Sequence, residues 1–464
     1  MSDATPERAT QPGATNPADS PAPLLVARRF LPLFVTQFLG ATNDTLFKNA
    51  IGILIIYRLL AGNPGEAQLL VSAAAGIFIL PYLLLSSAAG ELADRMEKSR
   101  LMRLIKLTEV CIMILGAASL FVGNPYLLLV VLFLLGIHST FFGPLKYSIL
   151  PQYLRPNELI VGNALIEGGT FIAILIGTII GALIVLGEGG LTVTSVVVIG
   201  IACAGLISSF FLPRAAANQP DLRVDWNLWR GAIGAMRVVR SSREVNWAVV
   251  GVSWFWAVGA VYLGQLPAFA KTVLGADEQV VTLMLTMFSI GIGAGSLACQ
   301  KILRGQVSPR FSPLALLGMA LFTFDLYIAA TNAARPDITG SAGAALIGIN
   351  AFISSMAGLH VLLDLVVIAA FGGIFTVPLY AIMQLKSDSR ERARAVAGNN
   401  ILNSIYIVAL TVVVLVLLKL GVTVPGIFIA CGVGNLLVGL LAFRLLPDAP
   451  LGHMVVWAVG RAKE

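Results

Sequence analysis

The sequence predicts an all-α membrane protein whose chain crosses the bilayer twelve times, in two six-helix bundles. Hydrophobic residues make up 57% of the 464 residues and charged residues only 12%, and the mean hydropathy is +0.88. A soluble domain carries about 25% charged residues, so this composition excludes a soluble globular protein. Because one span needs about 20 apolar residues, the chain has room for about a dozen spans joined by short loops.

Apolar stretches follow one another along the chain and are expected to form the spans. They are residues 30–57, 68–90, 101–122, 125–150, 160–186, 191–213, 245–270, 278–300, 313–333, 358–385, 394–419 and 424–446. The start of the chain is rich in Ala, Pro and Thr and lacks a long apolar segment beside a basic start, which predicts a disordered tail and not a cleaved signal peptide. We therefore expect a tail over 1–27, a first bundle over 28–213, a linker over 214–244, a second bundle over 245–447 and a tail over 448–464.

The linker is the longest connection between spans on its side of the membrane, and it separates six spans from six. It combines large apolar side chains with Arg230, Arg237 and Arg240, which predicts an amphipathic helix at the membrane surface and a hinge between the halves. The apolar residues are Trp226, Leu228, Trp229, Ile233 and Met236.

Lysine and arginine are distributed unevenly between the two sides of the membrane. The connections after even-numbered spans hold eighteen of them, whereas those after odd-numbered spans hold only Arg58, Lys271, Arg335 and Lys419. Basic loops stay in the cytoplasm, so both termini are expected to be cytoplasmic. The net charge of +7 is therefore explained by topology, and no nucleic-acid partner is expected.

Two short segments recur between the halves. Residues 162–167, which open the fifth span, match 398–403, which open the eleventh, and residues 89–94 match 294–299 at the ends of the second and eighth. Matches at equivalent places favour a duplicated six-helix unit, although short Gly, Ala and Leu strings also match by chance. Duplicated halves related by an axis along the membrane normal are typical of secondary transporters, with the substrate site between them.

One loop carries a recognisable signature. Gly90, Leu92, Ala93, Asp94 and Arg95, followed by the basic residues of 98–100, resemble the loop signature of the major facilitator superfamily, which runs Gly, x, Leu, Ala, Asp, Arg. The resemblance implies the major facilitator fold.

Three further segments, residues 38–50, 144–150 and 162–167, resemble the bacterial lysophospholipid transporter family, which includes versions fused to acyltransferase and acyl carrier ligase domains. The resemblance covers the chain from Phe30 to about Pro447, and it departs from the family at Thr45, where a second Asn is expected. No His is followed five residues later by Asp, so the fused acyltransferase is not expected here.

Ionisable residues inside the first-half spans are the main candidates for the site. Each costs about 2.5 to 3.5 kcal/mol at bilayer depth, so it needs a partner, a water-filled cavity or a functional reason. Asp44 lies near the midplane with Asn43 beside it, and Lys48 follows at the i, i+4 spacing that allows a pair along one helix face. That pair either contributes to the site or merely neutralises itself.

Lys146 and Glu167 lie at similar depth on neighbouring spans, with Asn163 one turn before Glu167. They are placed to form a cross-helix ion pair, which is either a site or a static strut. For a lipid substrate, Lys48 and Lys146 would attract the phosphate, and Asp44 or Glu167 would meet an ethanolamine ammonium. Lys106 and Glu109, at i, i+3, are expected to be structural.

The second half offers mostly neutral polar groups, so head-group charge is expected to be met by the first half. Asn399, Asn400 and Asn403 open the eleventh span, and Asp325 is the acid near the midplane of the ninth. These residues either bind substrate or join helices by hydrogen bonds. Further out, Asp364 follows His360 by four residues, which favours a local helix pair over a proton relay.

Gating is expected where the two halves meet at the cytoplasmic face. Asp94 can point at the free amide groups that begin the eleventh span, a contact that would latch the outward-open state. Gly90 would allow close helix approach beside it, and Arg95 belongs to the same loop, which could alternatively serve only to set topology. Further breaks that would loosen the fourth and tenth spans at the internal mouth are Gly143, Pro144 and Pro378.

These observations predict a bacterial inner-membrane transporter that moves lysophospholipids inward by alternating access, with membrane lipids, its substrate and a separate acyltransferase as partners. The alternatives are a proton-coupled exporter of drugs or small metabolites, and a non-transporting scaffold for an acyltransferase. An enzyme is not expected, because no nucleophile, base and orienting group converge. No cofactor or metal is expected, because the cysteines and histidines are scattered.

Overall fold

A computed structural model describes residues 24–333 and 346–445, and this part of the chain is helical, with one isolated β-bridge between Ala276 and Ile347. The first six long helices are α2 (Leu31–Leu54), α3 (Pro64–Arg95), α4 (Lys98–Val122), α5 (Pro125–Tyr153), α6 (Leu159–Ile184) and α7 (Gly190–Phe210). The second six are α9 (Arg243–Thr272), α10 (Glu278–Leu303), α11 (Ser312–Ala333), α14 (Met356–Lys386), α15 (Arg392–Lys419) and α16 (Val424–Leu445). Shorter elements are η2 (Ile55–Leu59), η3 (Pro156–Glu158), α8 (Leu228–Arg240) and α13 (Ile349–Ile353).

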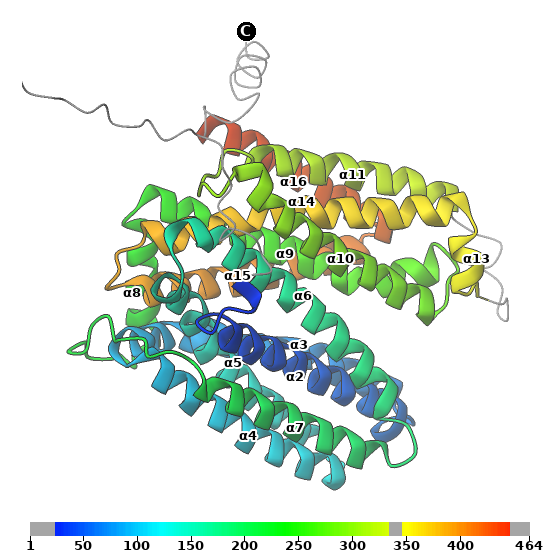
Figure 1. The fold of residues 1–464 in the computed structure, drawn as a ribbon. Coiled ribbons are helices and arrows are strands. Elements are labelled where there is room, and N and C mark those ends of the chain that lie inside the picture. Colours follow the sequence, from blue (N-terminus) through cyan, green and yellow to red (C-terminus); the bar gives the residue numbers. More distant parts are fainter. Residues whose placement is uncertain (1–23, 334–345, 446–464) are drawn as a thin grey trace, which may run out of the picture.

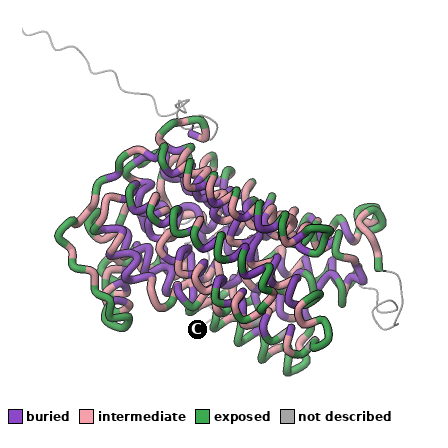
Figure 2. Tube along the Cα trace, turned by 90° about the horizontal axis from the view of Figure 1, so that it is seen from below, coloured by how far each residue is buried: buried purple, intermediate pink, exposed green. Residues whose placement is uncertain are grey.

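These twelve long helices confirm the predicted membrane fold. Eleven are long and apolar enough to cross a bilayer. The twelfth, α2, has 24 residues and carries several polar ones, namely Gln37, Asn43, Asp44, Lys48 and Asn49. Leu183, Val196 and Leu437 are 74%, 66% and 61% exposed, and exposed residues occur all along the helices (Figure 2). Such large apolar side chains on the outside suit contact with acyl chains.

Local sequence explains where several helices begin and end. The side chains of Asn63, Asn124, Asp277 and Ser355 accept hydrogen bonds from the first free N–H groups of α3, α5, α10 and α14. Gly123 ends α4 at a φ of 66°, in the left-handed region that favours glycine.

The helices form two bundles that contact each other through equivalent helices. In the first bundle α2 packs on α6 and α3 on α5, and across the bundles α3 packs on α15 and α6 on α10. The second helix of one half thus meets the fifth helix of the other, in both directions. Figure 1 shows the two bundles side by side, close together near α8 and further apart toward α13.

The linker helix α8 lies across the contact between the bundles. It packs against α3 and α15, with Gly231 close to Ser87 and Ala235 and Val239 close to Gly398. We call this end of the helices the linker end and the other the opposite end. Trp229 and Ile233 remain exposed on α8, as expected for an amphipathic helix.

Both ends of the described chain lie at the linker end. Arg29, just before α2, donates to the backbone carbonyl of Tyr153 at 3.0 Å, and Gly439 in the last turns of α16 adjoins Pro313. Residues 1–23 of the first predicted tail and the whole second predicted tail, residues 448–464, lie outside the described residues. Residues 24–27 are described, and Leu24 is buried, so this part of the first predicted tail packs against the bundle.

Close packing fixes α2 beside the bundle contact. A Cβ atom on Gly177 or Gly181 of α6 would lie 2.5 Å from the backbone carbonyl oxygen of Thr42 or Leu46. Only glycine allows the two helix backbones to approach this closely. This contact sets the position from which α2 presents Asp44.

Candidate functional site

A cavity of about 350 Å³ lies between the two bundles. Its first-bundle wall comes from α2, α3, α4, α5 and α6, and its second-bundle wall from α9, α14 and α15. The volume falls within the range of about 300–1,000 Å³ that is usual for ligand pockets. Among the predicted site residues, those that line it are Asp44, Lys48, Lys146, Asn400 and Asn403, together with the predicted gating residue Gly143.

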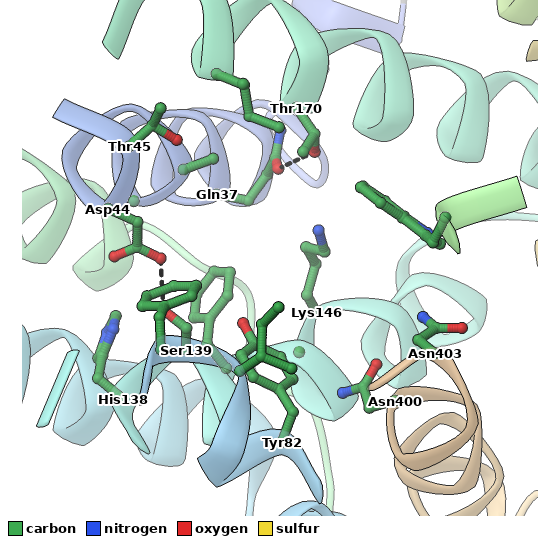
Figure 3. Close-up of a pocket in the computed structure, with 18 of the residues that line it drawn as sticks. Gln37, Asp44, Thr45, Tyr82, His138, Ser139, Lys146, Thr170, Asn400 and Asn403 are labelled. Atoms are coloured by element: carbon green, nitrogen blue, oxygen red, sulfur yellow. Dashed lines mark hydrogen bonds between the residues drawn. The ribbon is translucent and has the colours of Figure 1, made fainter. Parts of the chain in front are cut away.

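Asp44 is the acid of this cavity. Ser139 on α5 donates a hydrogen bond to its Oδ2 at 2.5 Å (Figure 3). Its Oδ1 is buried and has no hydrogen-bond partner among the described residues. The predicted pair with Lys48 is wrong: no ion pair joins them among the described residues, and the Lys48 amine lies 5.7 Å from the centroid of the Phe78 ring instead. The charge of this carboxylate is therefore only partly satisfied by the described part of the protein.

A second set of polar residues lies behind Asp44. Lys106 and Glu109 form a fully buried ion pair, Asn43 donates to Glu109 at 3.1 Å, and His138 Nε2 lies 3.4 Å from Glu109 Oε2. Asn43 does not line the cavity, contrary to its predicted role in substrate binding. Its hydrogen bond to Glu109 instead joins α2 to α4. Lys106 and His138 do line it, which the sequence did not indicate.

Stacked rings form the floor of the cavity toward the linker end. Tyr147 on α5 and Tyr380 on α14 have centroids 4.4 Å apart and nearly parallel planes, and Trp256 donates to the Tyr380 hydroxyl at 2.8 Å. The Tyr147 hydroxyl donates to Glu167, which is fully buried and does not line the cavity.

The predicted ion pair between Lys146 and Glu167 is therefore absent among the described residues. The Lys146 amine lies 4.6 Å from the Tyr147 ring centroid, and Figure 3 shows it directed into the open space of the cavity. Over residues 24–333 and 346–445, this amine therefore has no carboxylate partner.

The second-bundle wall is less charged than the first. Asn403 accepts a hydrogen bond from Ser253 at 2.7 Å, whereas the buried Asn400 Nδ2 has no hydrogen-bond partner and faces Gly143. Asn399 is fully buried but does not line the cavity, contrary to prediction. The remaining second-bundle lining residues are Trp256, Leu263, Tyr380, Ser404 and Ile407.

The predicted contact between Asp94 and the start of the eleventh span is present. Its Oδ1 accepts from the N–H of Ala393 and its Oδ2 from the N–H of Arg394, both at 3.2 Å. A Cβ on Gly90 would lie 2.6 Å from that of Ala397, so glycine allows α3 and α15 to meet here.

A second contact joins the bundles at the linker end. Asn163 on α6 and Gln384 on α14 exchange two hydrogen bonds of 2.9 Å. Asn163 therefore does not line the cavity, and its predicted part in binding is replaced by a bundle contact. Of the other predicted gating residues, Pro144 and Pro378 lie within α5 and α14, and Arg95 is exposed.

Asp325 lies outside the cavity, contrary to its predicted place near the substrate. It faces α14, where His360 Nε2 is 3.2 Å from its Oδ2 and 3.6 Å from Asp364 Oδ2. The spacing of His360 and Asp364 indicated a local pair, but nothing in the sequence places Asp325 beside them.

Comparisons with known proteins agree with this architecture. A family model described as Major Facilitator Superfamily matches residues 33–366. A lysophospholipid transporter of Photorhabdus laumondii is 27% identical, covering 89% of this chain and 94% of that protein, and one of Cronobacter sakazakii is 27% identical, covering 83% and 86%.

Solved transporters show the same fold. The human organic anion transporter MFSD10 matches with a TM-score of 0.66 at 15% identity, over 89% of this chain and 98% of that one. An outward-facing bacterial homologue of the iron transporter ferroportin matches with a TM-score of 0.62 at 14% identity, over 88% and 97%. The chain is a multi-pass membrane transporter and not an enzyme, and it belongs to the major facilitator superfamily.

Proposed function

We propose that this protein moves lysophospholipids from the outer to the inner leaflet of a bacterial inner membrane, where a separate acyltransferase reacylates them. The names of the relatives at 27% identity support this substrate class. The observation that carries the proposal is the cavity itself, which combines Asp44, Lys48 and Lys146 on its first-bundle wall with apolar side chains from both bundles.

The charged wall suits a zwitterionic head group. The Lys146 amine, which has no carboxylate partner among the described residues, would bind the phosphate, with Lys48 further out. The free Oδ1 of Asp44 would accept from the ethanolamine ammonium. Charge-assisted hydrogen bonds of this kind are about twice as strong as neutral ones, so both ends of the head group would be held.

The apolar part of the cavity suits the single acyl chain. Phe78 and Ile79 from α3 lie on one side, and Leu263 and Ile407 from α9 and α15 lie on the other. An acyl chain against this surface would leave sideways between helices into the bilayer. A small polar metabolite would gain no binding energy from these apolar side chains, which favours an amphiphile as the substrate.

The closed linker end fits one stage of alternating access. Contacts from Asp94 to α15, between Asn163 and Gln384, and between Tyr147 and Tyr380 join the bundles there. If the linker end faces the cytoplasm, as the basic loops indicate, this is an outward-facing stage. Rocking of the bundles would break these contacts and release the lipid inward.

The test is flipping of lysophosphatidylethanolamine by the purified chain in liposomes. Protein-dependent movement from the outer leaflet, without a proton gradient and without activity toward a panel of cationic drugs, is expected. Drug transport that requires a proton gradient would instead establish the exporter. Absence of all transport by correctly folded protein would favour the scaffold.

A further inference from the structure

Asp325, His360 and Asp364 form a cluster between α11 and α14 that no part of the proposed transport mechanism uses. One ligand-type atom from each, two carboxylate oxygens and an imidazole nitrogen, lies within 4.8 Å of the other two. None of the three lines the central cavity. His360 lies in the second turn of α14, toward the opposite end, and borders a surface hollow with Asn332 and Met356.

Asp364 has an unsatisfied carboxylate directed into this cluster. Its side chain is fully buried, and within the described part of the chain neither Oδ1 nor Oδ2 has a hydrogen-bond partner. Its Oδ2 lies 3.6 Å from His360 Nε2, which is beyond hydrogen-bond distance. A buried carboxylate without partners is costly, so an acceptor pair placed like this points to a cation.

The charges of the cluster also lack compensation. In the described ranges, no lysine or arginine nitrogen lies within 4 Å of either carboxylate, and one imidazole serves both. Two carboxylates in membrane-spanning helices therefore carry up to two negative charges against at most one positive. A divalent cation would neutralise the pair.

The spacing suits a small ion. Ligand atoms about 2.0 to 2.2 Å from a tetrahedral zinc ion lie about 3.4 Å from one another. His360 Nε2 lies 3.2 Å from Asp325 Oδ2 and 3.6 Å from Asp364 Oδ2, on either side of that value. An imidazole with two carboxylates favours a borderline metal such as Zn²⁺ over Mg²⁺ or Ca²⁺, which prefer oxygen alone.

The cluster is also open to an ion. The Asp325 and His360 side chains are 40% and 36% exposed, while Asp364 closes the inner side. A water molecule entering from the surface hollow would supply the fourth ligand.

We propose that Asp325, His360 and Asp364 bind a divalent transition-metal ion of the zinc type, which ties α11 to α14 near the opposite end of the second bundle. The site is independent of the proposed substrate, because the cluster lies outside the central cavity. It also revises the expectation from the sequence that the chain holds no metal.

The experiment is equilibrium dialysis of the full-length chain, without an affinity tag and freed of metal by a chelator, against Zn²⁺. One zinc per chain is expected, with affinity reduced at least tenfold in His360→Ala, Asp364→Asn and Asp325→Asn. Glu188→Gln removes an exposed carboxylate from the connection between α6 and α7 and should bind as the wild type does. If His360→Ala does not fold, His360→Asn replaces it.

Two further readouts separate a metal site from a merely structural cluster. Co²⁺ bound to the wild type should give the visible absorption of a low-coordinate site with an imidazole ligand, and His360→Ala should lose it. Added Zn²⁺ should raise the Tm of the wild type and of Glu188→Gln but not that of Asp364→Asn. The proposal is overturned if folded wild-type protein binds no zinc, or if the three cluster variants bind it as the wild type does.

Discussion

The rings of Tyr147 and Tyr380 stack at a centroid distance of 4.4 Å, and this pair joins the two bundles directly beneath the cavity. One ring comes from each bundle, so the pair cannot persist when the halves rock apart. The same two hydroxyl groups link the floor to Glu167 on one side and to Trp256 on the other.

Tyr380→Ala should weaken the closed floor. A stacked aromatic pair contributes about 0.5–1.5 kcal/mol beyond burial, which corresponds to about a two- to tenfold change in population. A cysteine at Thr170, in a chain whose native cysteines are replaced by serine, should be labelled faster from the linker end by a membrane-impermeant thiol reagent. Tyr380→Phe keeps the stack and should label slowly. Equal labelling of the Ala and Phe variants would show that the stack does not close the floor.

Asp94→Ala should impair transport by removing the acceptor for two N–H groups at the start of α15. Hydrogen bonds to charged groups contribute about 1.5–3 kcal/mol each, so the closed linker end should lose at least tenfold in population. Lysolipid flipping should fall while membrane insertion is normal. Glu188→Gln, which alters an exposed residue in the connection between α6 and α7, is the control and should transport normally. Full activity of Asp94→Ala would show that the contact of Asp94 with α15 does not hold the linker end closed.

Asn163 and Gln384 offer a way to hold the linker end closed. Their mutual hydrogen bonds place α6 against α14, so cysteines at both positions should be joined by a short bifunctional thiol reagent. Cross-linked protein should stop flipping, and a cleavable reagent should allow recovery on reduction. Continued flipping by fully cross-linked protein would mean that this contact does not open during the cycle.

Glu109→Gln should destabilise the fold, because it leaves Lys106 buried without its anion. Breaking a buried pair costs about 3–5 kcal/mol, whereas replacing both partners is often near neutral. Thermal unfolding in detergent should show a large fall in Tm for Glu109→Gln and a smaller one for Lys106→Met with Glu109→Leu. A double variant as unstable as the single one would indicate that Asn43 and His138 also depend on Glu109.

The sequence predicted the elements of this fold well, because the length of each apolar stretch is a local property of the chain. The twelve spans could be anticipated. The contact of Asp94 with α15 could be anticipated as well, because the free N–H groups at the start of a helix attract a carboxylate. The partners of Asp44 could not be anticipated from the sequence. Its spacing to Lys48 allows a pair, but Ser139 from α5 and Phe78 from α3 decide where each side chain points.

The misplaced residues share a physical cause. Asn399 and Glu167 lie close to cavity-lining residues, but the rotation of each helix turns them into the packed interior, and Asn163 lies nearer the linker end in the contact with Gln384. Sequence depth gives the height of a residue in the membrane, and helix packing gives its direction. Asp325 meets His360 across a connection of more than 20 residues, for which the sequence carries no spacing signal.

The most direct test of the proposed site compares two lysolipids that differ in one charge. Asp44→Asn keeps the shape of the side chain but removes the anion that would meet an ammonium group. Flipping of lysophosphatidylethanolamine by this variant in liposomes should fall at least tenfold relative to the wild type, while flipping of lysophosphatidylglycerol, which has no ammonium, should change little. Equal flipping of lysophosphatidylethanolamine by the variant and the wild type would contradict the account.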